Sequence, residues 1–233
     1  MTHEVKIHEA QTTILRELLF IPSASFSELQ KKTPLESDHF KFHIARLKDE
    51  GYVEKDTSTG HYSLTHKGKE YANKLDTDKN EIERQPKSAV IIVLHNDDMV
   101  LVQERLKHPY FGFWGYPGGK IRWGETILEA AARELKEETD LSAELIYRGV
   151  YHEHVESAET GEIIEDKIFH IVGATKPAGK MSDNFEGGRN AWMALAELEA
   201  KGKKYHSTDI ETNIGLGKAS FIESRQIYTK EQF

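Results

Sequence analysis

The chain has 233 residues, of which 38% are hydrophobic and 30% charged, and this is the composition of an ordinary globular protein long enough for two domains. It contains no cysteine, which excludes disulfides, thiolate metal sites and a cysteine nucleophile. The net charge of −8 lies mainly in the second part, because residues 1–80 carry 12 Lys and Arg against 13 Asp and Glu, and residues 81–233 carry 19 against 26. An acidic second part argues against non-specific nucleic-acid binding there and is compatible with a cation-dependent phosphate site.

No segment approaches the roughly 20 apolar residues that cross a bilayer. The segment from Met1 to Glu9 is too polar for a signal peptide. We therefore expect a cytoplasmic protein without a membrane partner.

Residues 1–78 show apolar residues at helical spacing, followed by two short β-type segments with a turn between them. Gly51 ends the third helix as its C-terminal cap. The fourth helix could pack across the domain or against a second copy. The predicted helices and strands are, in chain order, 8–20, 26–31, 36–50, 52–55, 61–64 and 65–75. Three helices and a β-hairpin predict a winged helix-turn-helix domain.

A segment at 79–87, nearly devoid of large apolar residues, is predicted to be a linker to a second domain at 88–233. Strands and helices alternate in that domain, which predicts an α/β layered fold. The predicted strands are 88–94, 99–103, 143–154, 167–173 and 191–193, and the predicted helices are 125–138 and 195–200.

The predicted helix at 125–138 carries Glu134, Glu137 and Glu138, which lie at i, i+3 and i+4 and therefore on one side. Three carboxylates held together repel one another unless cations lie among them, and such oxygen ligands prefer Mg²⁺ or Mn²⁺. Arg133 is placed to pair with Glu137 and orient it. The alternative is a solvated acidic helix face.

The longer spacing decides between these two interpretations. Gly119 is followed after five residues by Glu125, and after seven more by the run from Arg133 to Leu141. This segment resembles the Nudix box and matches eight of its nine specified positions over 23 residues. Asp140 stands where the family has glycine; the position ends the helix in a left-handed conformation that Asp tolerates less well than Gly.

The resemblance implies an α/β/α sandwich with a mixed sheet over about residues 87–200. It further implies that Glu134, Glu137 and Glu138 bind Mg²⁺ or Mn²⁺, with the carbonyl of Gly119 as an added ligand. Glu125 and Arg133 would brace the loop and the helix. The implied activity is pyrophosphohydrolysis of a nucleoside-diphosphate derivative, with ADP-ribose-like compounds and nucleoside triphosphates as the leading substrates, and the predicted catalytic residues are Glu125, Arg133, Glu134 and Glu137.

Three weaker features remain open in the second domain. The general base is Glu137 or a downstream glutamate, for which Glu153, Glu156 and Glu159 are candidates. Phe111, Phe113 and Trp114 either stack on a nucleobase or pack in the core. His152 and His154 share a strand face, and we interpret them as a surface pair because no third metal ligand is evident.

The first domain resembles the winged-helix domains of transcription regulators, notably from His39 to Lys48. This resemblance implies double-stranded DNA as a partner, contacted by Lys41, His43 and Lys48. The alternative to an enzyme is therefore a transcription regulator whose Nudix domain senses a nucleotide. A third interpretation is that the winged helix only forms a homodimer of the enzyme.

Overall fold

The computed structural model describes residues 8–76 and 81–233, and the chain divides into two compact units between Arg84 and Gln85. The domain boundary predicted between residues 78 and 79 lies outside the described residues. Within the two described ranges, no helix is both long and apolar enough to span a membrane.

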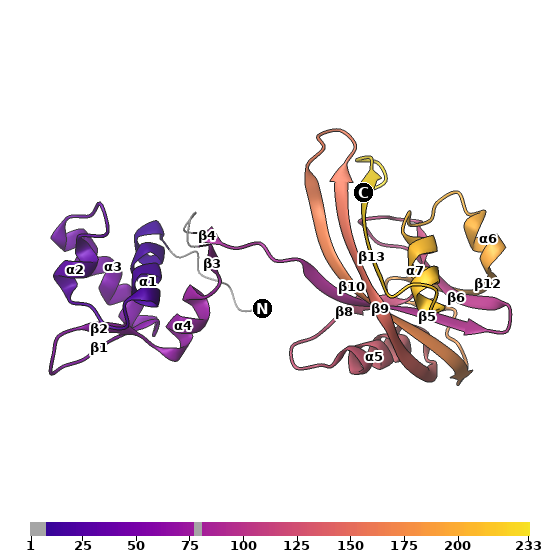
Figure 1. The fold of residues 1–233 in the computed structure, drawn as a ribbon, viewed down its shortest axis with the longest axis horizontal. Coiled ribbons are helices and arrows are strands. Elements are labelled where there is room, and N and C mark those ends of the chain that lie inside the picture. Colours follow the sequence, from indigo (N-terminus) through magenta and orange to yellow (C-terminus); the bar gives the residue numbers. More distant parts are fainter. Residues whose placement is uncertain (1–7, 77–80) are drawn as a thin grey trace. The chain divides into compact units, whose positions relative to one another are not determined.

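The first unit has the predicted order of three helices, a β-hairpin and a fourth helix (Figure 1). Ser25 begins the second helix with a capping box, because its hydroxyl and the Glu28 carboxylate each accept from the other's backbone N–H. Gly51 follows the third helix with φ +76°, as expected of a glycine cap. The elements are α1 (Glu9–Phe20), α2 (Phe26–Gln30), α3 (Ser37–Asp49), β1 (Val53–Lys55), β2 (Tyr62–Leu64) and α4 (His66–Ala72).

An apolar core holds these elements together. It joins one face of α1 to one face of α3 and to the inner side of the hairpin, and its largest members include Ile14, Leu15, Phe40, Leu47 and Leu64. After α4, two short strands pair antiparallel: β3 (Leu75–Asp76), where the sequence predicted the end of a helix, and β4 (Glu81–Ile82), which lies in the predicted linker.

The second unit is built on one mixed sheet (Figure 1). Its order is β11-β12-β6-β5-β10-β9-β13, with β7 paired to β6 and β8 paired to β5. The pairs β10/β5 and β9/β13 are parallel, and the other pairs are antiparallel. The strands are β5 (Lys87–Asn96), β6 (Met99–Arg105), β7 (Trp114–Gly115), β8 (Gly118–Lys120), β9 (Ser142–Ser157), β10 (Ile163–Ala178), β11 (Asn184–Phe185), β12 (Gly188–Ala194) and β13 (Phe221–Tyr228).

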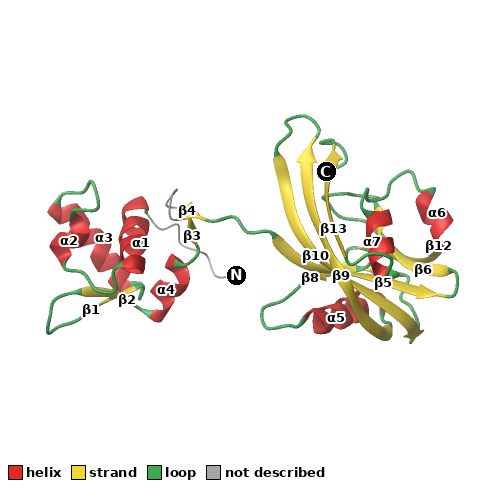
Figure 2. Cartoon of the chain, viewed as in Figure 1, coloured by secondary structure: helices red, strands yellow, loops and turns green. Residues whose placement is uncertain are grey.

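Helices pack on both faces of this sheet (Figure 2). Because side chains alternate along a strand, β5 directs Val90 and Ile92 to one face and Val93 to the other. The first face is covered by α5 (Ile127–Thr139), and the second by α6 (Leu195–Glu199) and α7 (Thr208–Gly215). The prediction of an α/β/α sandwich with a mixed sheet is thus confirmed.

Two elements at the end of the chain were not predicted. α7 follows a Lys-rich segment, and β13 alternates apolar and polar residues weakly as an edge strand beside β9. Both matter for the site, because α7 closes the side of the sheet opposite α5 and β13 extends the sheet beyond β9.

Candidate active site

Helix α5 places an acidic row beside an apolar one. Thr126 and Glu129 form a capping box at its first turn. Leu135 is buried in the core against the sheet. The helix ends at Asp140, which has φ +61°, so the left-handed conformation expected for this departure from the glycine pattern is confirmed. The helical period then puts Glu134, Glu137 and Glu138 along one side of this helix, where they form the acidic row.

Arg133 lies at the centre of the ion pairs on that side. Its guanidinium donates two hydrogen bonds to Glu125, at 2.5 and 2.8 Å, and one to the carbonyl of Lys120 at 3.1 Å. It also donates to Glu134 at 2.7 Å and to Glu137 at 3.2 Å. The hydrogen bonds from Arg133 lower the pKa of Glu125 to about 2. One side chain thus joins the loop before the helix to two of the predicted metal ligands.

Glu138 is half-buried at the end of this row. Its carboxylate accepts a hydrogen bond from Gln103 at 3.0 Å, and burial raises its pKa to about 7. Asn190 donates from its side-chain amide to the carbonyl of Glu138 at 2.8 Å and to that of Ser182 at 2.7 Å. Sequence reasoning missed Gln103 and Asn190, since a lone amide on a strand carries no pattern of its own.

Gly119 lies on β8, where it pairs with Val90 of β5. A Cβ atom at position 119 would overlap the carboxylate of Glu134. Only a glycine therefore lets this backbone approach the glutamate so closely.

These residues fit a hard divalent cation. Glu134 and Glu138 are half-buried, and Glu137 is exposed, so the acidic row runs from the protein interior to solvent. The donors are carboxylate oxygens beside the Gly119 backbone, which is the chemistry that Mg²⁺ and Mn²⁺ prefer.

A cavity of about 740 Å³ opens beside the acidic row and is large enough for a nucleotide-sized ligand. Glu134, Glu138 and Gly119 form part of its wall. Basic side chains are also in the wall, which suits a polyanion: Lys87, Arg105, Lys107, Lys120, Arg122 and Lys167.

The same cavity has a second acidic wall, which sequence reasoning did not identify as a unit. Glu153 and Glu211 are only 5% and 3% exposed, and Ser207 donates to Glu211 at 2.9 Å. Tyr151 donates to Glu153 at 3.2 Å. Burial and the nearby charge of Glu153 raise the pKa of Glu211 to about 8, so its carboxyl is neutral and can donate a hydrogen bond at neutral pH.

The three downstream glutamates that were candidates for the general base differ in position. Glu153 lines the cavity. Glu156 pairs with Arg225 at 2.7 Å, and Glu159 accepts from the backbone N–H of Lys230 at 2.9 Å in a turn. Of the three, Glu153 shares a cavity with the acidic row of α5.

The aromatic residues before the box do not line this cavity. Phe113 and Trp114 are buried in two separate apolar clusters, and Phe111 is 49% exposed. Tyr116 and Tyr205 lie in the cavity wall instead. The core-packing interpretation therefore describes Phe113 and Trp114.

The predicted DNA-contacting residues of α3 separate into two groups. Lys41 and Lys48 are exposed. His43 is half-buried, its ring lies 4.4 Å from that of His8, and burial lowers its pKa. The sequence placed His43 with Lys41 and Lys48 among the DNA-contacting residues, but its helical position turns its ring toward His8 at the start of α1, so it is less exposed than the two lysines.

The interpretation of His152 and His154 as a pair without a third ligand also needs correction. Asp166 of β10 is paired in register with His154, and the three side chains gather on one patch of the sheet. Sequence reasoning missed Asp166 because the partner of a strand residue depends on register, which spacing alone does not reveal.

An α/β/α sandwich with this acidic helix row beside a cavity defines the class of protein. The sequence matches the NUDIX domain family over residues 85–210, and the chain belongs to that family. It shares 36% identity over 84 residues with the ADP-ribose pyrophosphatase of Methanocaldococcus jannaschii, covering 34% of this chain and 50% of that protein. It shares 32% identity over 90 residues with the oxidized purine nucleoside triphosphate hydrolase of Mus musculus, covering 37% of this chain and 53% of that protein. The chain thus spans about half the length of these two relatives.

Solved structures support the fold. The crystal structure of a MutT mutator protein from Bacillus halodurans superposes with a TM-score of 0.52 at 23% identity. The superposition covers 63% of this chain and 93% of that one. At this identity the likeness concerns the fold alone.

Proposed function

We propose that the protein is a metal-dependent pyrophosphohydrolase that cleaves a nucleoside-diphosphate derivative, either an ADP-ribose-like compound or a nucleoside triphosphate. The observation that carries this proposal is the joint presence, in one cavity wall, of the α5 carboxylates and several lysine and arginine side chains. The names of two relatives, an ADP-ribose pyrophosphatase and a nucleoside triphosphate hydrolase, support the substrate class.

In this proposal Glu134, Glu137 and Glu138 hold Mg²⁺ or Mn²⁺, together with the carbonyl of Gly119. Bound cations would neutralise the pyrophosphate oxygens and make a water molecule more acidic. Arg133 keeps the ligands in place, since it already donates to Glu134 and Glu137.

The proton of the attacking water needs an acceptor. Glu137 is exposed and accepts from Arg122 at 3.0 Å as well as from Arg133, so it lies at the open side of the site. Glu153 is buried in the cavity, and burial raises its pKa above that of an ordinary glutamate, which favours it as a proton acceptor. Substitution of each separately by Gln, followed by the pH profile of kcat, distinguishes them.

The acidic inner wall suits the nucleoside part of the substrate. Glu153 and the neutral carboxyl of Glu211 offer an acceptor beside a donor, and Tyr205 adds an aromatic surface. This arrangement matches the mixed donor and acceptor edge of a nucleobase or a ribose.

The test is a screen of nucleoside-diphosphate compounds and nucleoside triphosphates with Mg²⁺ or Mn²⁺, with identification of the products to locate the broken bond. Glu137→Gln should lower kcat by at least about 100-fold for whichever substrate is cleaved. Glu129→Gln is a matched control, because it removes the same charge from the same helix and a capping box accepts Gln as well as Glu. Full activity of Glu137→Gln would refute the assignment.

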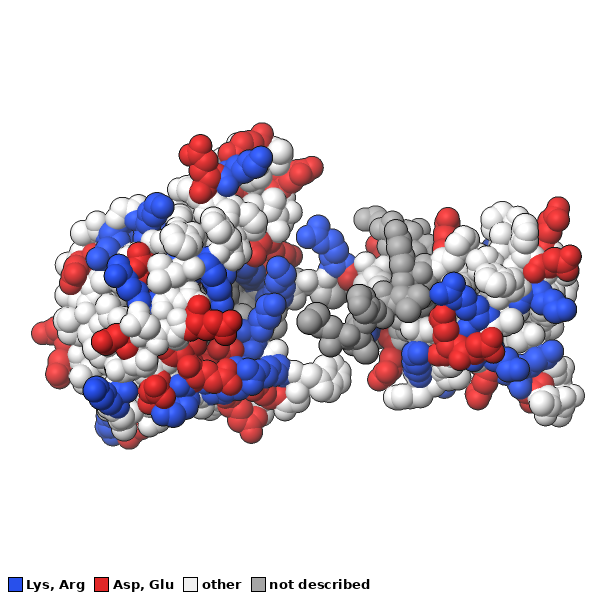
Figure 3. Space-filling model, turned by 180° about the vertical axis from the view of Figure 1, so that it is seen from behind, with Lys and Arg blue, Asp and Glu red and all other residues white. Residues whose placement is uncertain are grey.

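A second function is proposed for the first unit, in which α3 contacts double-stranded DNA and the enzyme domain senses or removes a nucleotide. The exposed Lys41 and Lys48 and the order of three helices and a hairpin favour this function. Figure 3 shows Lys and Arg mixed with Asp and Glu on the visible face of this unit, without a broad basic area. We therefore expect DNA binding to be weak, with few phosphate contacts and a correspondingly shallow dependence on salt.

A gel-shift assay against promoter DNA at two salt concentrations tests this second function. Lys41→Ala should weaken binding and leave hydrolysis unchanged, whereas Lys69→Ala on α4 should affect neither. If the wild-type protein forms a dimer by light scattering and shifts no DNA, the first unit serves dimerisation instead.

A further inference from the structure

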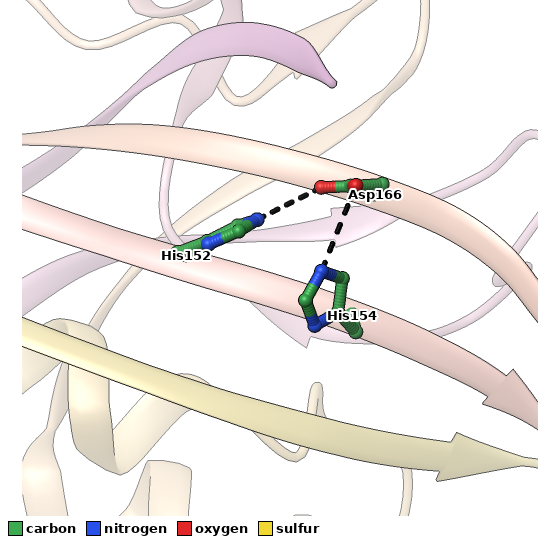
Figure 4. A group of neighbouring side chains, drawn as sticks. All are labelled: His152, His154 and Asp166. Atoms are coloured by element: carbon green, nitrogen blue, oxygen red, sulfur yellow. Dashed lines mark hydrogen bonds and ion pairs between the residues drawn. The ribbon is translucent and has the colours of Figure 1, made fainter. Parts of the chain in front are cut away.

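His152 and His154 lie on the face of the sheet opposite the cavity. Side chains alternate along β9, and the intervening Glu153 lines the cavity, so both histidines point to the other side. On β10 the same alternation separates Asp166 from Lys167, which also lines the cavity. The two histidine rings turn toward Asp166 on the neighbouring strand (Figure 4).

The distances between these side chains fit a shared ion. The Nε2 atom of His152 lies 2.9 Å from Oδ1 of Asp166, and Nε2 of His154 lies 3.6 Å from Oδ2. One ligand atom from each of the three residues falls within 4.8 Å of the others. In a tetrahedral zinc site with bonds of about 2.0–2.2 Å, neighbouring ligand atoms stand roughly 3.5 Å apart. Small side-chain rotations would therefore bring all three onto one ion.

A fourth side chain gives a second, independent indication. The other ring nitrogen of His152, Nδ1, lies 2.9 Å from Oε1 of Glu223 on β13. A histidine that binds a metal through one nitrogen almost always donates a hydrogen bond from the other, often to a carboxylate, which fixes its tautomer. Glu223 occupies that position for His152.

An ion pair between a protonated His152 and its two carboxylates explains part of this arrangement. It does not explain His154, because 3.6 Å is too long for a hydrogen bond to Asp166. The nearest basic side chain on β13 is Arg225, which pairs with Glu156 at 2.7 Å. A cation between His154 and Asp166 would account for both orientations.

We propose that His152, His154 and Asp166 bind one divalent transition-metal ion, with Zn²⁺ as the best fit and Glu223 as the hydrogen-bond acceptor that orients His152. Imidazole nitrogen suits Zn²⁺ and its neighbours, whereas the all-oxygen row on α5 suits Mg²⁺ or Mn²⁺. The two sites therefore select different ions. The ion would cross-link β9 to β10 directly behind Glu153 and Lys167, and so stiffen the cavity wall from outside.

The test uses the full chain, stripped with a chelator and then equilibrated with Zn²⁺ in excess Mg²⁺, which occupies the oxygen ligands of α5 without competing for imidazole. Metal analysis after desalting should find one zinc per chain, and Co²⁺ in its place should give the visible absorption of a tetrahedral site. His154→Asn should lose this zinc and the cobalt spectrum, while His66→Asn, an exposed histidine on α4, should keep both.

Two further variants make the result specific. Glu223→Gln should keep the stoichiometry but lower zinc affinity by about 10–100-fold, as expected of a group that orients a ligand. Asp166→Asn should lose binding like His154→Asn, and circular dichroism checks that each variant is folded. A wild-type protein that retains no zinc, or a His154→Asn protein that binds zinc as tightly as the wild type, would overturn the proposal.

Discussion

Replacement of Glu138 by Gln should stabilise the metal-free protein while it abolishes hydrolysis. Burial raises the pKa of Glu138 from 4.5 to about 7, which means that the folded protein resists ionising this carboxyl. In the unfolded chain the carboxyl ionises at its ordinary pKa of 4.5. The free energy of unfolding therefore falls as the pH rises from 4.5 through about 7, where the folded protein also loses this proton. At pH 8 the loss in the free energy of unfolding is complete and amounts to about 3 kcal/mol, at 1.36 kcal/mol per pKa unit. At pH 5 this loss is below about 1 kcal/mol.

The assay is thermal unfolding in a chelator at pH 5 and pH 8. For a domain of this size, about 3 kcal/mol corresponds to a rise in Tm of roughly 6–12 °C for Glu138→Gln at pH 8, with little change at pH 5. Added Mg²⁺ should raise the Tm of the wild type, because it favours the charged carboxylate, and should affect the variant less. A variant that is less stable at pH 8, or that retains full activity, would refute the view that this carboxyl is kept in the interior to bind a cation.

Two other substitutions test the site. Gly119→Ala should lower kcat with little effect on urea unfolding, because the new methyl group displaces only the Glu134 carboxylate at the free end of its side chain, whereas Gly202→Ala, which meets no atom within 4 Å, should leave kcat unchanged. Glu211→Gln should flatten the pH dependence of stability. Because the pKa of Glu211 is about 8 in the folded wild type, the wild type loses on the order of 3 kcal/mol in free energy of unfolding as the pH rises from about 5 to above 8. The variant should not show this loss. A wild-type Tm that stays level over this range would count against a buried, neutral Glu211.

The parts of the fold that follow a short-range pattern could be predicted from the sequence. The period of Leu135 and its apolar neighbours predicts α5, and the same period places the three glutamates on one side. The pairing of Arg133 with Glu137 was predicted from their spacing along the helix, and the structure contains it at 3.2 Å.

What could not be predicted depends on contacts between distant segments. Glu153 and Glu211 are 58 positions apart in the sequence. They meet only because α7 packs over the face of the sheet to which the side chain of Glu153 points. Asp166 reaches His154 through the register of a long hairpin, and that register contains bulges that no local pattern encodes. His43 was misplaced because the prediction considered α3 alone, without the start of α1 that covers it.

The guanidinium of Arg133 has one more consequence. It already pairs with three glutamates, so Glu134 and Glu137 are held in place before any cation binds. Cation binding then does not have to order these side chains, because the entropy cost of ordering them is already met in the folded protein. The protein should consequently exchange its cations quickly and reversibly, and its backbone should look the same by hydrogen exchange whether or not they are present.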